Sequence, residues 1–223
     1  MKIKAIITGS TGMVGKGVLL ECLENEDIES VLVVNRKPLG LQHPKLREII
    51  HKDFFDLSAI SGEMQGYDCC FFCLGVSSAG MAEDVYTHLT YDLTLTFAKA
   101  FLARNPGSLF TYVSGAGTDS TEKGRSMWAR VKGRTENALL ALPFRAAYMF
   151  RPGFIEPMKG IKSGTRLYNA LYIILWPLFP VFRAMPKYAT DTIRLGNAMI
   201  KVACLGYEKK VLECTDINII ANR

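Results

Sequence analysis

The sequence predicts an α/β protein built on a doubly wound parallel sheet. Short apolar runs alternate with longer segments of helical periodicity, and a glycine-rich turn follows the first run directly. The runs are nearly continuous in hydrophobicity, as expected for strands that helices cover on both faces. We expect strands at Ile3–Thr8, Val31–Val34, Leu46–Ile50, Cys69–Leu74, Leu109–Val113 and Ala146–Phe150.

The segments between these strands have the pattern of amphipathic or buried helices. We expect helices over Val14–Asn25, Ala82–Arg104 and Ser126–Leu142, and a short one at Leu57–Ile60. A last helix over Asp191–Leu205 should begin at a cap, Thr190 or Asp191, and end at Gly206. The terminal stretch KKVLECTDINII can supply one more strand.

A change of pattern follows Phe150, where the turn-rich RPGFIEPMKG precedes the apolar run LYNALYIILWPLFPVF. That run has about 16 residues and contains two prolines, whereas a membrane span needs about 20 unbroken apolar residues. Tyr168, Tyr172 and Trp176 would share one helix face. We interpret this region as core, substrate lid or dimer face, with contact at a membrane surface as an alternative. The chain is then one domain, 1–223, with a substrate-side extension at about 151–190.

Composition places the chain among globular proteins, with 49% hydrophobic and 22% charged residues. The six cysteines lie in apolar runs and lack the spacing of a disulfide framework or, with the three histidines, of a metal site. We expect free thiols, no signal peptide before the first strand, and a cytoplasmic location. The net charge of +6 could serve nucleic-acid binding, but no nucleic-acid motif accompanies it, and a polyanionic small molecule accounts for part of it equally well.

The turn ITGSTGMVGKG carries the clearest functional signal. Gly9, Gly12 and Gly15 lie between the first strand and the first helix. Gly9 should permit the tight turn, Gly12 the approach of backbone N–H groups to a pyrophosphate, and Gly15 close packing of helix on strand. The helix N-terminus would then face the phosphates. This context predicts a Rossmann-type dinucleotide site, with Gly9, Ser10, Thr11, Gly12, Met13 and Val14 as binding residues.

The end of the second strand indicates which dinucleotide is bound. An NAD site usually has a carboxylate there, on the ribose 2′-hydroxyl. Here Asn35 is followed by Arg36 and Lys37. An arginine would pair with a 2′-phosphate and could stack on adenine, so we favour NADP(H) over NAD(H). The alternative is that Arg36 is only a solvated loop cation.

Seven motifs in this order resemble the short-chain dehydrogenase/reductase superfamily over nearly the whole chain. They are TGSTGMVG, VNRKP, DFFD, CLGVS, YVSGAG, ARVKGRTENAL and FRPGFIEP. The chain is most similar to the atypical or extended type, which includes NAD-dependent epimerases and dehydratases, and within it to the Tat-interacting-protein-like group.

The resemblance implies further site residues. Asp53 and Phe54 would lie at the adenine end, and Leu74 and Gly75 would pass over the adenosine ribose. Ser114 would polarise a substrate carbonyl, and Lys132 would bond the nicotinamide ribose. Pro152, Gly153 and Phe154 would run beside the nicotinamide. Without the resemblance, Asp53 alone is more often a turn residue and Ser114 a strand-end hydroxyl.

One position departs from the family pattern. The family's catalytic tyrosine precedes its lysine by four residues, and Trp128 stands there before Lys132. An indole N–H does not titrate in water, so it cannot deliver the proton that carbonyl reduction requires. None of the nine tyrosines has a lysine four residues later. Tyr112, on the strand face of Ser114, and Tyr168 or Tyr172 are weak substitutes supported by position alone.

Two functions remain open from the sequence. One is an NADP-dependent oxidoreductase- or epimerase-like enzyme with altered acid–base residues, acting on a small apolar or aromatic substrate. The other is a catalytically weak or inactive cofactor-sensing protein that binds a protein partner through the apolar run. A homodimer through the helices Ala82–Arg104 and Ser126–Leu142 is an option under either.

Overall fold

The computed structural model describes residues 2–161 and 185–223. Its main sheet has seven strands in the order β3-β2-β1-β4-β5-β6-β9, and every neighbouring pair is parallel. The strands are β1 (Ile3–Thr8), β2 (Ile28–Asn35), β3 (Leu46–Ile50), β4 (Cys69–Phe72), β5 (Leu109–Val113), β6 (Ala146–Arg151) and β9 (Val211–Glu213). The predicted parallel α/β fold is therefore confirmed.

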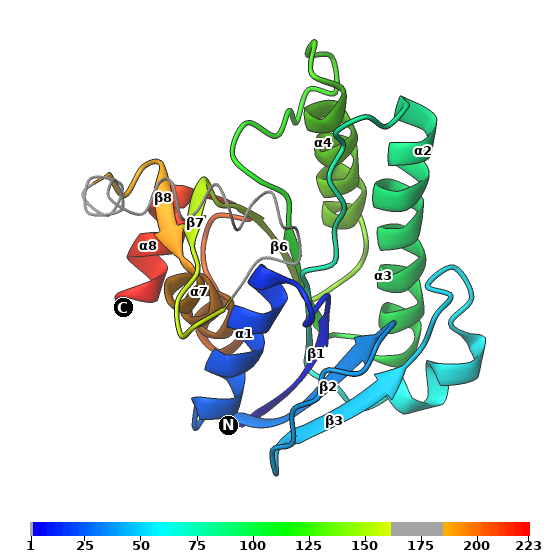
Figure 1. The fold of residues 1–223 in the computed structure, drawn as a ribbon, viewed down its shortest axis with the longest axis vertical. Coiled ribbons are helices and arrows are strands. Elements are labelled where there is room, and N and C mark those ends of the chain that lie inside the picture. Colours follow the sequence, from blue (N-terminus) through cyan, green and yellow to red (C-terminus); the bar gives the residue numbers. More distant parts are fainter. Residues whose placement is uncertain (1, 162–184) are drawn as a thin grey trace.

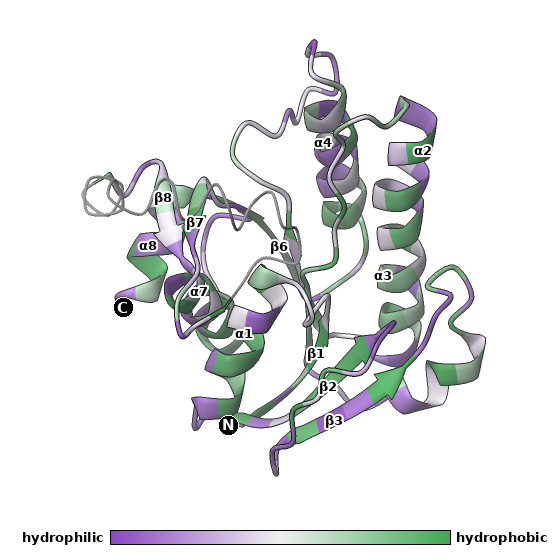
Figure 2. Ribbon diagram, in the orientation of Figure 1, coloured by the Kyte–Doolittle hydropathy of each residue, from purple (hydrophilic) through white to green (hydrophobic). Residues whose placement is uncertain are grey.

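Helices cover both faces of this sheet (Figure 1). On one face lie α1 (Met13–Glu24), α7 (Thr192–Leu205) and α8 (Cys214–Ala221). On the other lie η1 (Ser58–Met64), α2 (Glu83–Thr87), η2 (His88–Asp92), α3 (Leu93–Arg104) and α4 (Met127–Leu140). Figure 2 shows hydrophobic residues along β1 and β2 and hydrophilic ones at the tip of the loop before α4. The alternation of strand and helix thus buries apolar side chains in two layers.

Several boundaries differ from those expected. The long helix predicted over Ala82–Arg104 is interrupted at His88–Asp92 by a π-helical turn. Periodicity did not indicate this, because a single five-residue turn is too short to be recognised from the pattern of apolar residues. The C-terminal stretch does supply β9, but Cys214 then begins a helix with a capping box between Glu213 and Asp216. The last predicted helix, by contrast, is confirmed at both ends: it begins after the cap Asp191, whose carboxylate accepts from the backbone N–H of Arg194 at 2.7 Å, and it ends at Gly206.

A second, two-stranded sheet was not predicted. It pairs β7 (Phe154–Glu156) with β8 (Ala189–Asp191) in parallel. Each strand has only three residues, too few for an alternating pattern to be recognised. This small sheet brackets the segment whose residues Tyr168, Tyr172 and Trp176 were assigned to a lid; they lie outside the described residues. None of the helices that the structure describes has the length and hydrophobicity that a membrane crossing requires.

Candidate functional site

Most of the predicted site residues follow strands at the carboxyl edge of the sheet. Because β1 lies between β2 and β4, the connections that leave β1 and β4 depart in opposite directions, which is where such sheets bind ligands. Gly9, just after β1, has a φ of +70°, and a Cβ there would lie 2.7 Å from the carbonyl oxygen of Cys73, just after β4. Only glycine fits this position, for both reasons.

The glycine-rich turn is compact. The N–H of Gly12 donates to the carbonyl oxygen of Gly9 at 2.9 Å. A Cβ on Gly15 would overlap that same carbonyl oxygen. Gly15 therefore allows α1 to approach the turn itself rather than a strand, which corrects the role expected for it. Gly12 precedes α1 without a side-chain cap among the described residues, so the first N–H groups of the helix face the turn.

Two polar residues of this region are turned into the protein. Ser10 is fully buried, and its hydroxyl donates to Asn35 Oδ1 at 2.8 Å. Asn35 Nδ2 in turn donates to Glu48 Oε1 at 2.8 Å, and the backbone N–H of Leu39 donates to the same oxygen at 2.9 Å. These bonds tie the turn to β2 and β3. Thr11, Arg36 and Lys37 are exposed.

Of the residues expected near adenine, one is likewise buried in the protein and another is exposed. Phe54 is 3% exposed and packs in the core beside Phe97, so its side chain contributes to the fold. Asp53 is exposed, and its carboxylate accepts from the backbone N–H of Phe55 at 2.9 Å, as a turn acid does. Leu74 is partly exposed and Gly75 is exposed beyond β4.

At the end of β5 the structure brings Ser114, Lys132 and Trp128 together. Lys132 Nζ donates to the backbone carbonyl of Ser114. Burial lowers the pKa of the Lys132 amine to about 8, and the carboxylate of Glu136 opposes that lowering. The Trp128 ring lies beside Gly117, where a Cβ would be 3.7 Å from it. The helix face of Trp128 and Lys132 thus meets the chain that leaves β5.

The Ser114 hydroxyl is directed inward. It is 6% exposed and donates to Glu136 Oε1 at 2.5 Å, with the carbonyl oxygen of Phe150 at 3.1 Å as a second acceptor. A serine hydroxyl has one proton, and both acceptors belong to the protein. In this geometry Ser114 does not offer a donor to a carbonyl substrate, which differs from the role that the resemblance implied.

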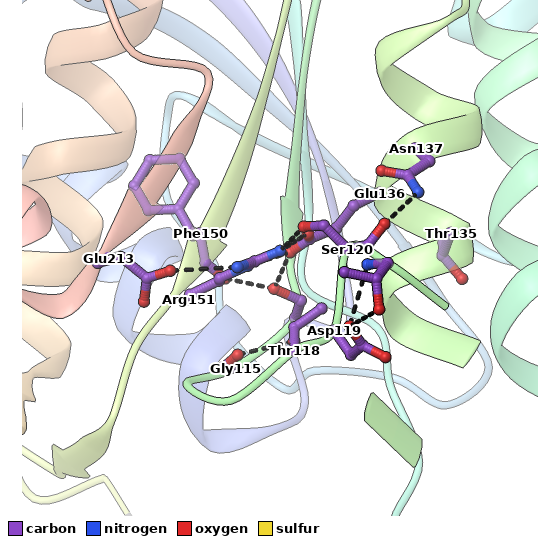
Figure 3. Close-up of polar contacts among 12 residues, drawn as sticks. Gly115, Thr118, Asp119, Ser120, Thr135, Glu136, Asn137, Phe150, Arg151 and Glu213 are labelled. Atoms are coloured by element: carbon purple, nitrogen blue, oxygen red, sulfur yellow. Dashed lines mark hydrogen bonds and ion pairs between the residues drawn. The ribbon is translucent and has the colours of Figure 1, made fainter. Parts of the chain in front are cut away.

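Glu136 belongs to a buried ion pair that the sequence analysis missed (Figure 3). The guanidinium of Arg151 donates from Nε to both of its carboxylate oxygens, at 3.0 and 3.2 Å, and also from Nη2. The Glu136 side chain is 1% exposed and the Arg151 side chain 10%. Arg151 also donates to Ser120 Oγ at 2.5 Å and to Glu213 Oε1 at 3.2 Å. Two signals could have indicated it: Glu136 follows Lys132 by one helical turn, and Arg151 directly precedes the Pro152–Gly153 turn.

The segment after β6 is held on both sides. The N–H of Ala116 donates to the carbonyl oxygen of Pro152 at 2.8 Å. A Cβ on Gly153 would overlap the carbonyl oxygen of Tyr188, which accepts from the N–H of Phe154 at 2.8 Å. Pro152 to Phe154 therefore lie between the end of β5 and the start of β8. This placement brings Tyr188, an exposed residue, beside the segment predicted to meet the nicotinamide.

Tyr112 is not a replacement for the missing tyrosine. It is 2% exposed in the core between the sheet and its helices, and burial raises its pKa well above the ordinary value. The six cysteines are free thiols. Four of them are buried. A fifth, Cys73, is partly exposed as a residue, and desolvation of its thiol raises the pKa of that thiol to about 12. Within the described ranges, no cluster of histidine, cysteine and carboxylate side chains could hold a metal ion.

No protein-family model matches the chain. Sequence relatives do. The protein FMP52 of Meyerozyma guilliermondii is 26% identical over 193 residues, which are 81% of this chain and 80% of that protein. The protein HTATIP2 of Rattus norvegicus is 28% identical over 152 residues, 67% of this chain but 61% of its own length. These homologues, HTATIP2 and the FMP52 proteins, are members of the atypical short-chain dehydrogenase/reductase family, to which this chain is therefore similar in sequence.

Solved structures of other proteins share the fold. The enzyme WbmF of Bordetella bronchiseptica, in complex with NAD+, has a TM-score of 0.69 at 15% identity and covers 99% of this chain and 78% of its own. The UDP-glucuronic acid 4-epimerase of Bacillus cereus, in complex with UDP-glucuronic acid and NAD, has a TM-score of 0.65 at 12% identity and covers 94% and 76%. At such identities the likeness shows the fold alone.

The relatives overturn one expectation. FMP52 proteins of several fungi are mitochondrial, which contradicts a purely cytoplasmic assignment for this chain. The cytoplasmic inference was based on free thiols and on the lack of a secretory signal. Both features describe a reducing environment and a protein that is not secreted, and neither distinguishes the cytosol from the interior of an organelle.

Proposed function

We propose that this chain binds NADP(H) at the carboxyl edge of its sheet and is an oxidoreductase- or epimerase-like enzyme in which Trp128 replaces the catalytic tyrosine. The observation that carries the proposal is the turn from Gly9 to Gly15. Its backbone is too close to Cys73 and to itself for any side chain at Gly9 or Gly15, and α1 begins there without a side-chain cap among the described residues. Such a turn fits a diphosphate, which backbone N–H groups and a helix N-terminus bind.

The preference for NADP(H) rests on the end of β2. Asn35 is occupied by Ser10 and Glu48, so its side chain is not directed at a ribose. The Glu48 carboxylate, which reaches this corner from β3, already accepts two hydrogen bonds. Arg36 and Lys37 are exposed and provide positive charge for a 2′-phosphate. The NAD named with WbmF and the epimerase supports a nicotinamide dinucleotide in general, not the additional phosphate.

The bound cofactor would supply hydride chemistry, and the chain would orient it. Lys132 would bond the nicotinamide ribose, and Pro152 to Phe154 would line the nicotinamide side. A proton donor of the tyrosine type is missing at position 128, and the hydroxyl of Ser114 is bonded inward. We therefore propose weak or no dehydrogenase activity of the tyrosine-dependent kind. An apolar or aromatic substrate and a homodimer through α3 and α4 belong to the same proposal.

Calorimetric titration of the pure protein with NADPH and NADH tests the cofactor. NADPH should bind more tightly than NADH, and Arg36→Asp should remove most of that preference, a change of about tenfold or more because a charge-assisted bond to phosphate is lost. Lys99→Asp, at an exposed position on α3, controls for the change in net charge. Uptake of neither dinucleotide by the wild-type protein would overturn the proposal.

Steady-state assays test the catalytic part. NADPH oxidation with a panel of ordinary carbonyl compounds should be weak or absent. Robust turnover that disappears in Ser114→Ala would contradict the proposal, because it would mean that Ser114 acts on the substrate directly. Tight NADPH binding with neither carbonyl reduction nor epimerisation of any compound tested would instead favour the cofactor-sensing protein, whose partner-binding surface was expected in the apolar run.

A further inference from the structure

We propose that Glu136 is the positioning residue of this site, because its buried carboxylate fixes the hydroxyl of Ser114 and lies one helical turn from Lys132 on α4. This inference rests on the proposed cofactor site and adds to it a residue to which the sequence analysis gave no role. Glu136 is assigned no contact with substrate or cofactor. It acts on Ser114 and Lys132, the two residues that the family pattern places in the site.

The geometry around Glu136 is that of a carboxylate held from several directions. One oxygen accepts from Ser114, just after β5, and both accept from Arg151 on β6. Arg151 is held in turn by Ser120 in the loop after β5 and by Glu213 at the start of α8 (Figure 3). A charge with 1% of its side chain exposed must be paired to remain in place, and the guanidinium provides the pair. The carboxylate is therefore fixed, directly or through Arg151, by groups from three other segments: the loop after β5, β6 and the end of β9.

Fixing the carboxylate fixes the Ser114 proton. The hydroxyl donates inward, so what it has left for a ligand is a lone pair. A ligand group that meets Ser114 Oγ would then be a hydrogen-bond donor, such as an alcohol, and not a bare carbonyl oxygen. The structure thus connects a residue on α4 to the kind of functional group that the end of β5 can accept.

The same carboxylate acts on Lys132. The amine is bonded to the neutral carbonyl of Ser114, and the charged groups nearby are Glu136 on its own helix and, behind it, Arg151 on β6 with Glu213 at the start of α8. Burial alone lowers the pKa of the amine, and Glu136 opposes that effect. Without the negative charge of Glu136, the amine would lose its proton at a still lower pH. Lys132, which would bond the nicotinamide ribose, would then be uncharged in more of the molecules.

A purely structural role for Glu136 makes a different prediction. If the ion pair only holds α4 against β6, a neutral residue of the same shape would change stability and leave the titration of Lys132 unaltered. The side-chain Nζ resonance of Lys132, followed by NMR in 15N-labelled protein and assigned with Lys132→Arg, distinguishes the two. We expect a midpoint of about 8 in the wild type and one that is about one pH unit lower in Glu136→Gln.

Two variants make the test specific. Glu213→Gln removes the other carboxylate from the same arginine and should leave the midpoint unchanged, because Glu213 is not on α4 and its side chain is 53% exposed. Glu136→Asp keeps the charge and should restore most of the wild-type midpoint. If Glu136→Gln fails to fold, the double variant Glu136→Gln/Arg151→Gln removes both buried charges. The midpoint should then still fall, but by less, because loss of the guanidinium partly offsets loss of the carboxylate beside the amine. An unchanged midpoint in whichever of these two variants folds would overturn the inference.

The proposed function is tested separately in the same experiment. NADPH titration of the same samples reports whether the site takes the dinucleotide at all. A wild-type chain that does not bind NADPH would refute the proposed function while its Lys132 midpoint still shows whether Glu136 acts on the amine. A chain that binds NADPH but shows no effect of Glu136→Gln on the midpoint refutes only the role of Glu136.

Discussion

At the end of β1 the predicted ligand-binding groups are backbone atoms, whereas at the ends of β5 and β6 they are connected by a buried network of charged side chains. The turn from Gly9 to Gly15 keeps its shape because no side chain fits between it and its neighbours. Ser114 and Lys132 are kept in place by hydrogen bonds, one of which reaches the Glu136–Arg151 ion pair.

This difference predicts different sensitivities. A backbone turn is damaged by added volume and is nearly indifferent to pH, because peptide groups do not titrate. A network of buried charges is damaged by loss of a partner and responds to pH through its amine. The comparison would be contradicted if the turn from Gly9 to Gly15 responded to pH, or if the buried network tolerated the loss of a charged partner.

The largest effect is expected from Arg151→Met. It leaves the Glu136 carboxylate buried without its cation, which typically costs about 3–5 kcal/mol of the free energy of unfolding. Urea denaturation of wild type and variant measures it. Arg130→Met is the matched control, since Arg130 pairs at 2.6 Å with Glu83, whose side chain is 53% exposed, and such pairs contribute about 0–1 kcal/mol. Equal losses in the two variants would mean that burial of the pair is energetically unimportant.

The next effect is the pH dependence contributed by Lys132. Its pKa is about 8 in the folded chain and near its ordinary value of 10.5 when unfolded. Between these values the unfolded chain binds a proton that the folded chain lacks, so stability from this residue rises with pH across that window. The rise is up to about 3 kcal/mol, reduced by the partial exposure of the side chain. Denaturation at about pH 7.5 and about pH 9.5 should show it in the wild type and not in Lys132→Met; parallel behaviour would exclude a depressed pKa.

At the backbone end, Gly15→Ala should act through volume. The added methyl group would overlap the Gly9 carbonyl oxygen, and overpacking of this kind costs about 1–3 kcal/mol of stability. NADPH binding should weaken beyond detection because the turn must open to accommodate the methyl group. Gly62→Ala, where an added Cβ meets nothing within 4 Å, should change neither quantity. Normal NADPH affinity in Gly15→Ala would show that the turn does not bind phosphate.

The same contrast explains what the sequence could predict. The strands and the turn at Gly9 were predictable because apolar runs and glycine spacing are local signals. The ion pair was not. The place of Glu136 one turn after Lys132 and of Arg151 before Pro152 is visible in the sequence, but the two residues come from different elements, and no local pattern shows that they are buried or paired. For Ser114, the resemblance predicted the position, but the direction of a hydroxyl proton depends on its partner, which the motif does not contain. The π-helical turn at His88–Asp92 and the three-residue strands β7 and β8 fall below the length at which periodicity is informative.

The smallest effect is expected from Trp128→Tyr, which restores the family's spacing of a phenol one turn before Lys132. The ammonium would lower the pKa of the new tyrosine, so some carbonyl reduction with NADPH should appear. The gain should stay below the roughly 100-fold at the lower end of general acid catalysis, because the Ser114 proton remains bonded to Glu136. Trp128→Phe removes the indole without adding a phenol and should show no gain. If Trp128→Tyr folds, binds NADPH and still reduces no carbonyl in the panel, the missing acid is not what separates this chain from an active reductase, and the cofactor-sensing alternative is favoured.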